Sequence, residues 1–300
     1  TGITENWIVD GNPKSAIGLS LIALLIVFAL IIFEKLSRRK AKRWSENPAS
    51  QNSQGWKLKK YRSLLAIVAT LFPPVFSIGI PLFWILLNID QVQKGLNIEL
   101  LTLSLRTIGL GLITALITII FSLIIALANR QNKFLLLKII TYPAGVGYAI
   151  PGTVLALSLI TICNSESNYI AILILIWGYI VRFLTISKGS IDSSLERISP
   201  SLDEAANGLG SNWFDVIKKI HLPLLKGPIF VGSLLVFVDT IKELPITFIL
   251  RPFDFDTLSV RIYQYAGDER MVEAILPAIF IMIFGLLASS TLIQSLEEKN

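Results

Sequence analysis

Three charged side chains interrupt an apolar stretch in the C-terminal third of the chain. Asp239, Lys242 and Glu243 stand just before Pro245 in the sequence Val-Asp-Thr-Ile-Lys-Glu-Leu-Pro. A charge at the centre of a bilayer costs about 2.5–3.5 kcal/mol, so such side chains pair with each other or face a polar cavity. The i, i+3 spacing of Asp239 and Lys242 allows a helical ion pair. Two interpretations stay open: a structural ion pair, or a polar pathway through a membrane.

The sequence lacks the residues for metal or nucleotide chemistry. It has one cysteine, Cys163, and one histidine, His221, so it can form neither a disulfide framework nor a Cys/His metal site. The phosphate-binding pattern Gly-x-x-x-x-Gly-Lys-Ser/Thr is absent from it. We therefore expect no catalytic residue, no metal site and no cofactor in this chain. Any ATP must be bound by a partner subunit.

The composition indicates an integral membrane protein. The 300 residues are 53% hydrophobic and 16% charged, and several apolar runs reach the roughly 20 residues that a helix needs to cross a bilayer. We expect an all-α, polytopic membrane protein with about seven transmembrane helices, six of them in one core. The expected spans are approximately residues 17–33, 63–87, 101–128, 134–162, 169–187, 228–250 and 274–293.

The distribution of charge predicts the orientation of these spans. The net charge is +6, and basic residues are concentrated between Lys35 and Arg62. Lys and Arg are enriched in cytoplasmic loops, so this pattern indicates membrane topology and not nucleic-acid binding. Counting spans from that loop places residues 188–226 in the cytoplasm and residues 251–273 outside.

Three regions follow from this order. Residues 1–33 form an outside N-terminal segment and a leftover first span, residues 34–62 form a basic cytoplasmic linker, and residues 63–300 form a six-span core. Thr1 would lie outside, without an initiator methionine or a targeting signal. We therefore expect the chain to be the C-terminal part of a longer polypeptide; the alternative is a complete chain whose first helix has its N-terminus outside.

A short helix is expected within the cytoplasmic region 188–226. Ser201 and Glu204 have the spacing of a capping box, in which each side chain satisfies a backbone N–H of the first turn. Gly208 and Gly210 are expected to end this helix, because glycine readily adopts the left-handed conformation after a helix.

A second short helix is expected directly afterwards. Ser211 would cap it, residues 212–222 would form it, and Pro223 would end it. Trp213 and Phe214 lie on its apolar side at helical spacing with later isoleucines. One interpretation is a contact surface for a partner, and the other is a loop whose Trp213 rests among lipid headgroups.

The spacing in this region resembles the cytoplasmic loop of binding-protein-dependent ABC importer permeases. The pattern is Glu-Ala-Ala, three residues, Gly, nine residues and Ile-x-Leu-Pro. The resemblance implies that this loop couples the chain to an ATPase subunit. The implied coupling residues are Glu204, Ala205, Ala206, Gly210, Trp213, Phe214, Ile220, Leu222 and Pro223.

Four segments look like the ferric-iron group of these permeases: residues 143–152, 238–245, 250–258 and 263–270. The resemblance implies a non-enzymatic translocation subunit of the bacterial inner membrane. Its implied partners are ABC ATPase subunits, an extracytoplasmic solute-binding protein, a second permease core, fused or separate, and the lipid bilayer. Candidate pathway residues are Gly147, Pro151, Asp239, Lys242, Glu243 and Pro245.

Other substrates and another class of transporter remain open. Permeases for thiamine, polyamines and sulfate share the architecture, and an ion-coupled secondary transporter could use the charges before Pro245 as a relay. Arg106, Lys138 and Arg182 lie nearer span ends and are expected to snorkel towards the interface. The charges of the outside loop 251–273 could meet a solute-binding protein or simply be solvated.

Overall fold

The computed structural model describes residues 2–40, 58–90, 96–131, 135–163 and 167–297; most of the expected basic linker, residues 41–57, lies outside this part. The long helices are α2 (Pro13–Lys40), α3 (Tyr61–Leu87), α5 (Ile98–Gln131), α8 (Asn168–Leu195), α11 (Leu222–Ile241) and α14 (Met271–Glu297). The shorter ones are α1 (Gly2–Thr4), α6 (Leu135–Thr141), α7 (Gly152–Ile162), α9 (Pro200–Gly208), α10 (Trp213–Val216), α12 (Pro245–Leu250) and α13 (Leu258–Gly267). The expected all-α, polytopic fold is confirmed.

Six helical stretches of the described part are long and apolar enough to cross a membrane. They match six of the expected spans, and two of them, α5 and α8, are longer than expected at both ends. The fifth stretch begins at Trp213, because α10, a π-helical turn and α11 run on without a break as far as Ile241. It ends before Pro245, which the expected span 228–250 had included. Pro245 lacks the N–H that a continuous helix would need at this position, and this favours a break before it.

The expected span at residues 134–162 is broken in the middle. It forms α6, two short 3₁₀ turns, η2 (Pro143–Gly145) and η3 (Gly147–Ala149), and then α7. Pro151 lacks the N–H that a continuous helix needs, and Ile150 before it is extended, with φ −73° and ψ 126°. The sequence therefore yields two short helices joined by a non-helical segment in place of one long helix.

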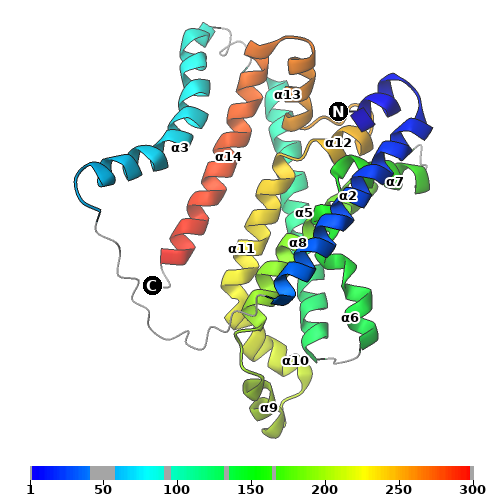
Figure 1. Ribbon diagram of the computed structural model, residues 1–300, viewed down its shortest axis with the longest axis vertical. Coiled ribbons are helices and arrows are strands. Elements are labelled where there is room, and N and C mark those ends of the chain that lie inside the picture. Colours follow the sequence, from blue (N-terminus) through cyan, green and yellow to red (C-terminus); the bar gives the residue numbers. More distant parts are fainter. Residues whose placement is uncertain (1, 41–57, 91–95, 132–134, 164–166, 298–300) are drawn as a thin grey trace.

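The centre of the molecule is the group α5, α8 and α11, which pack against one another (Figure 1). Tyr179 and Phe183 of α8 are fully buried at this centre, as is Val236 of α11. Small hydroxyl residues also lie buried along one face of α5, at Thr114, Thr118 and Ser122. Side chains of this size let helices approach closely, which is how helices associate when lipid provides no hydrophobic drive.

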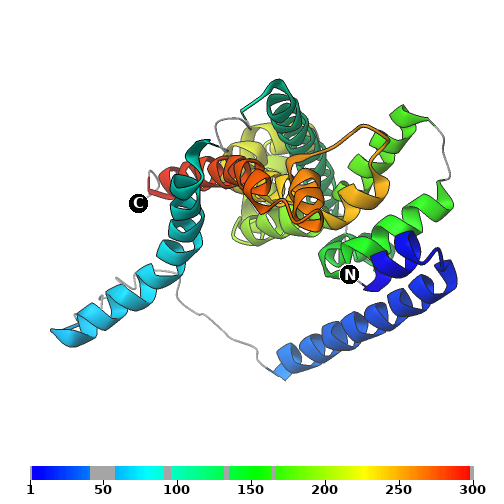
Figure 2. The same ribbon diagram turned by 90° about the horizontal axis from the view of Figure 1, so that it is seen from above.

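The connections of the bundle gather at its two ends. Figure 1 shows α9 and α10 at one end, and α12 and α13 at the opposite end. α14 packs against α11 and α13. α3 stands to one side of the central group in both views, and α2, which overlaps that group in Figure 1, lies apart from it when seen from above (Figure 2). None of the described α3 side chains is buried. The bundle thus presents α9 and α10 together at one end.

Candidate functional site

The first helix of the candidate coupling segment, residues 199–223, is capped by Ser199. Its hydroxyl oxygen accepts from the Ser201 N–H at 3.3 Å, and Pro200 occupies the first helical turn, where its missing N–H costs nothing. The capping box expected between Ser201 and Glu204 is therefore wrong, because the helix begins earlier. Glu204 is exposed and available for contact with another subunit.

The end of α9 is a Schellman motif centred on Gly210. The Gly210 N–H donates to the Asn207 carbonyl at 3.0 Å, and the Ser211 N–H donates to the Ala206 carbonyl at 3.0 Å. Gly210 has φ +81°, the left-handed conformation that glycine adopts at little cost. The predicted stop at Gly210 is confirmed, whereas Gly208 is the last residue of the helix itself.

Replacing Gly210 with alanine should loosen this end of α9. A side chain in the left-handed region costs about 1–2 kcal/mol. We expect amide hydrogen exchange of α9 to become roughly tenfold faster, as measured by mass spectrometry. The matched control is Gly208→Ala, since Gly208 has a helical backbone and open space around its Cα. Equal exchange in the two variants would contradict the prediction.

The second helix is capped by Asn212 and not by Ser211 as expected. Its Oδ1 accepts from the Asp215 N–H at 2.9 Å. The expected end at Pro223 is also wrong. Residues Ile217–His221 form a π-helical turn, in which the Leu222 N–H donates to the Ile217 carbonyl, and the helix continues through Pro223 into α11. The wider turn accommodates a residue that lacks an N–H.

The coupling segment turns two aromatic rings outward. Trp213 is 39% exposed and Phe214 is 75% exposed, and their ring centroids lie 5.3 Å apart in an edge-to-face arrangement. Val216 is buried, and Ile217 packs against the apolar cluster between α5, α8 and α11. Of the other candidate coupling residues, Ala206 is buried, Ile220 and Leu222 are half-buried, and Ala205 and Pro223 are exposed. The helix is held by its inner face and leaves its aromatic pair exposed.

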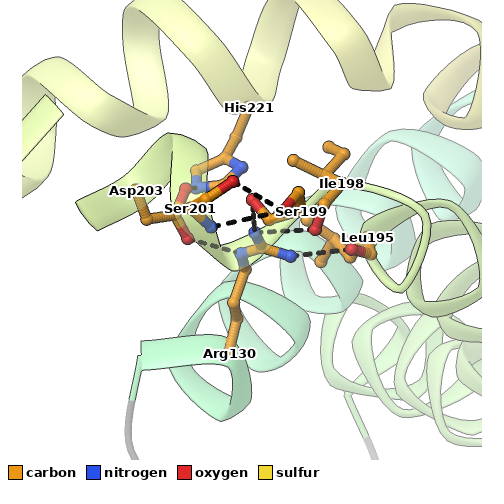
Figure 3. A network of polar contacts seen from close by, with 7 residues as sticks. All are labelled: Arg130, Leu195, Ile198, Ser199, Ser201, Asp203 and His221. Atoms are coloured by element: carbon orange, nitrogen blue, oxygen red, sulfur yellow. Dashed lines mark hydrogen bonds and ion pairs between the residues drawn. The ribbon is translucent and has the colours of Figure 1, made fainter. Parts of the chain in front are cut away.

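A cluster of polar groups ties this segment to the end of α5 (Figure 3). Arg130 Nε donates to Asp203 Oδ2 at 2.7 Å. Its other two nitrogens donate to the backbone carbonyls of Leu195, the last residue of α8, and of Ile198. His221 Nε2 lies 3.2 Å from Asp203 Oδ1. Sequence reasoning missed Arg130 and Asp203, because the two residues are 73 positions apart and nothing in the chain signals their contact.

The charges before Pro245 divide into two pairs. Asp239 Oδ1 lies 2.6 Å from Lys242 Nζ, as the i, i+3 spacing predicted, and Lys242 is largely exposed. Glu243 is buried and lies 3.7 Å, Oε2 to Nε, from Arg182 of α8. The expectation that Arg182 snorkels is therefore wrong: its guanidinium points inward to a buried carboxylate. A lone arginine within an apolar span is a signal that could have suggested an ionic partner.

The broken span meets this second pair. A Cβ on Gly152 would lie 2.7 Å from Arg182 Nη1, 2.9 Å from Glu243 Oε1 and 3.2 Å from the Pro245 Cβ. A Cβ on Gly147 would lie 2.0 Å from the Val181 carbonyl oxygen. The structure thus brings four of the six candidate pathway residues, Gly147, Pro151, Glu243 and Pro245, to the contact between the broken span, α8 and the break after α11. A role in translocation stays a prediction for all six.

At the opposite end of the bundle, several charged side chains form ion pairs with one another. Arg251 pairs with Asp256, and Arg261 lies 2.6 Å from Glu99 and 3.2 Å from Asp256. Arg106 Nη1 donates to the Asp254 carbonyl at 2.8 Å and so holds this loop; that Arg106 snorkels towards the interface stays a prediction. The side chain of Lys138 lies outside the described part. Among the described residues, no three His, Cys, Asp or Glu side chains come together as metal ligands.

Comparison with curated proteins finds two ferric relatives that are longer than this chain and a sulfate relative that is not. The chain is 26% identical over 217 residues to the Fe(3+)-transport system permease protein FbpB 2 of Haemophilus influenzae, covering 70% of this chain and 43% of that protein. It is 23% identical over 291 residues to the putative ferric transport system permease protein FbpB 1 of the same organism, covering 86% and 42%. A probable sulfate transport system permease protein of Chlorella vulgaris is 24% identical, over 58% of this chain and 71% of that protein. The chain spans less than half the length of the two ferric relatives.

Comparison of folds agrees with the helical architecture. A bacterial ABC transporter involved in the import of the acidic polysaccharide alginate superimposes with a TM-score of 0.50 at 14% identity, covering 77% of this chain and 99% of that chain. The family model described as "binding-protein-dependent transport system inner membrane component" matches residues 119–299. That match contains α8 to α13 and the whole coupling segment. This multi-pass chain therefore belongs to the family of inner-membrane permease components of binding-protein-dependent transport systems.

Proposed function

We propose that the chain is a permease core of an ATP-driven ferric-iron importer. A solute-binding protein delivers the ion outside, a path between this core and a second core alternates in access, and ATP turnover on a partner subunit resets it. A highly charged ion has no low-energy route through hydrocarbon, so it needs such a protein-lined aqueous path. Two observations support ferric iron as the substrate: the ferric-transport names of two relatives, and the segments that resemble the ferric group.

The observation that carries the proposal is the outward aromatic pair on an anchored helix. Trp213 and Phe214 are exposed, while the Asn212 cap and the Gly210 turn fix the helix that bears them. Exposed aromatic residues on a rigid support are the usual energetic centre of a protein interface. In this proposal residues 63–300 form the core, residues 188–226 its cytoplasmic loop, and residues 1–62 the preceding span and linker.

The first test is retention of the ATPase. In the variant with Trp213→Ala and Phe214→Ala, we expect the ATPase partner to bind at least about thirtyfold more weakly, the effect of losing an aromatic hot spot of about 2 kcal/mol. Co-purification from detergent-solubilised membranes measures this. Phe253→Ala is the matched control, because Phe253 is 86% exposed but lies at the opposite end of the bundle. Equal loss of ATPase from both variants would count against the docking role.

The second test concerns the substrate and the energy source. Cells that lack other iron routes should take up radiolabelled ferric ion only when the chain, its binding protein and its ATPase are all present. Labelled sulfate in the same assay tests the alternative that the Chlorella vulgaris relative raises. Uptake that needs no ATPase and collapses with an uncoupler would instead support an ion-coupled secondary transporter.

A further inference from the structure

One guanidinium joins four separate elements at the end of the bundle that carries the coupling segment. Arg130 belongs to the last turn of α5. Its Nη1 donates to the carbonyl of Leu195, the last residue of α8, at 2.7 Å, and its Nη2 donates to the carbonyl of Ile198 at 3.0 Å. Its Nε donates to Asp203 of α9, whose other carboxylate oxygen faces His221 of the π-helical turn (Figure 3).

The backbone acceptors explain why an arginine suits this place. The last carbonyls of a helix have no partner within the helix and carry its partial negative charge. Arg130 gives the Leu195 carbonyl a second donor beside the Ile198 N–H, and its planar fork reaches Asp203 and the Ile198 carbonyl at the same time. A lysine is a single compact ammonium on a flexible stem, so it cannot make these bonds together.

The contact is shielded from water, which strengthens it. Side chains of Arg130 and Asp203 are 16% and 25% exposed, and that of His221 is 5% exposed. Charge-assisted hydrogen bonds gain strength in such surroundings, because the effective dielectric constant is lower than in water. Within the Arg130 cluster, defined as Arg130, Asp203 and His221, the bond from Arg130 to Asp203 is therefore a firm connection and not a surface ion pair.

Little else holds α9 to the bundle. Among the residues of α9, Ala206 is the one that is buried. The following helix is different, because its Val216 is buried and Ile217 packs against the apolar cluster between α5, α8 and α11. The second half of the coupling segment is thus held by apolar packing, and the first half is held mainly through Arg130.

We propose that Arg130 is a positioning residue that makes α5 move together with the coupling segment. This inference rests on the proposed function. When an ATPase partner displaces the segment, α11 follows because it is covalently continuous with the second helix of that segment. The end of α5 follows through the bonds of Arg130 to Asp203 and to the end of α8. ATP turnover thereby reaches three central helices together.

The test is Arg130→Lys in the complete transporter with its ATPase and binding protein, reconstituted in proteoliposomes. We expect the ATPase to stay bound and to hydrolyse ATP, while the ATP consumed per labelled ferric ion rises about tenfold, the factor that one lost charge-assisted hydrogen bond represents. Arg197→Lys is the matched control, since Arg197 is an exposed arginine in the same connection. Asp203→Asn keeps the acceptor oxygen without the charge and should give a smaller rise.

Two outcomes would overturn the proposal. One is a wild-type ratio of ATP to ion in both Arg130→Lys and Asp203→Asn. The other is loss of the ATPase from Arg130→Lys, which would make Arg130 part of the docking surface and not a transmitter. If the wild-type complex itself neither retains the ATPase nor transports, the proposed function fails instead.

A spin-label measurement tests the tether without any transport. Labels on cysteines introduced at exposed Gln131 and Leu209, with Cys163→Ser, report the distance between α5 and the end of α9. We expect one narrow distance distribution in the wild type, a broad one in Arg130→Lys and a narrow one in Arg197→Lys. An equally narrow distribution in Arg130→Lys would overturn the proposal.

Discussion

Replacing Gly147 with alanine is expected to destabilise the chain by about 3 kcal/mol, the upper part of the range for overpacking a filled site. The added methyl group would lie 2.0 Å from the Val181 carbonyl oxygen and 3.1 Å from the Val181 carbonyl carbon. Both are backbone atoms of α8, so no side-chain rotation can make room.

The broken span would therefore have to move away from α8. That movement would break the bond from the Tyr148 N–H to the Thr185 hydroxyl at 3.2 Å, and the bond from Arg182 Nη1 to the Ile150 carbonyl at 3.2 Å. Gly145→Ala is the matched control, because a Cβ there would meet open space. Unfolding by SDS in mixed micelles compares the two variants. Equal midpoints for Gly147→Ala and Gly145→Ala would contradict the prediction.

Arg182→Met is expected to destabilise the chain by about 3–5 kcal/mol, because it leaves the buried Glu243 carboxylate without its ionic partner. Glu243 would keep the Ile246 N–H, which donates to its Oε1 at 3.3 Å, but one neutral donor does not replace a guanidinium. The same unfolding titration measures the loss. Combining Arg182→Met with Glu243→Gln should recover part of it, since the two changes are coupled.

Lys242→Met serves as the control for that prediction. Lys242 pairs with Asp239 at 2.6 Å but is 58% exposed, so its loss should cost at most about 1 kcal/mol. A loss for Arg182→Met as small as that for Lys242→Met would contradict a structural role of the buried pair. Uptake separates the two interpretations of these charges: a stable Glu243→Gln variant that no longer transports would support a pathway role.

Sequence patterns predicted the features that are determined by residues close together in the chain. Apolar runs of about 20 residues located six of the spans, and the glycine rule located the end of α9 at Gly210. The coupling pattern also led to the family, which the match over residues 119–299 confirms. Each of these features depends on residues adjacent in the chain, so it can be read without knowing the fold.

The two missed ion pairs have the opposite cause. Arg182 and Glu243 are far apart in the chain, and so are Arg130 and Asp203; their pairing follows from the packing of α5, α8 and α11, which no short pattern encodes. Pro223 was expected to end a helix, but the π-helical turn before it removes the conflict. Residues 134–162 were expected to form one span, but the chain is extended at Ile150, just before Pro151 and close to the contact of Gly147 with α8.

The uninterrupted helical path from Trp213 to Ile241 has a mechanical consequence. Its 29 residues correspond to about 43 Å of helix at 1.5 Å per residue, so the aromatic pair and Asp239 lie near opposite ends of one continuous helical path. If this helix tilted by about 5° around one end, its other end would move by about 4 Å. If a partner docks at Phe214 as proposed, its displacement would reach the neighbourhood of Lys242 along one continuous helix.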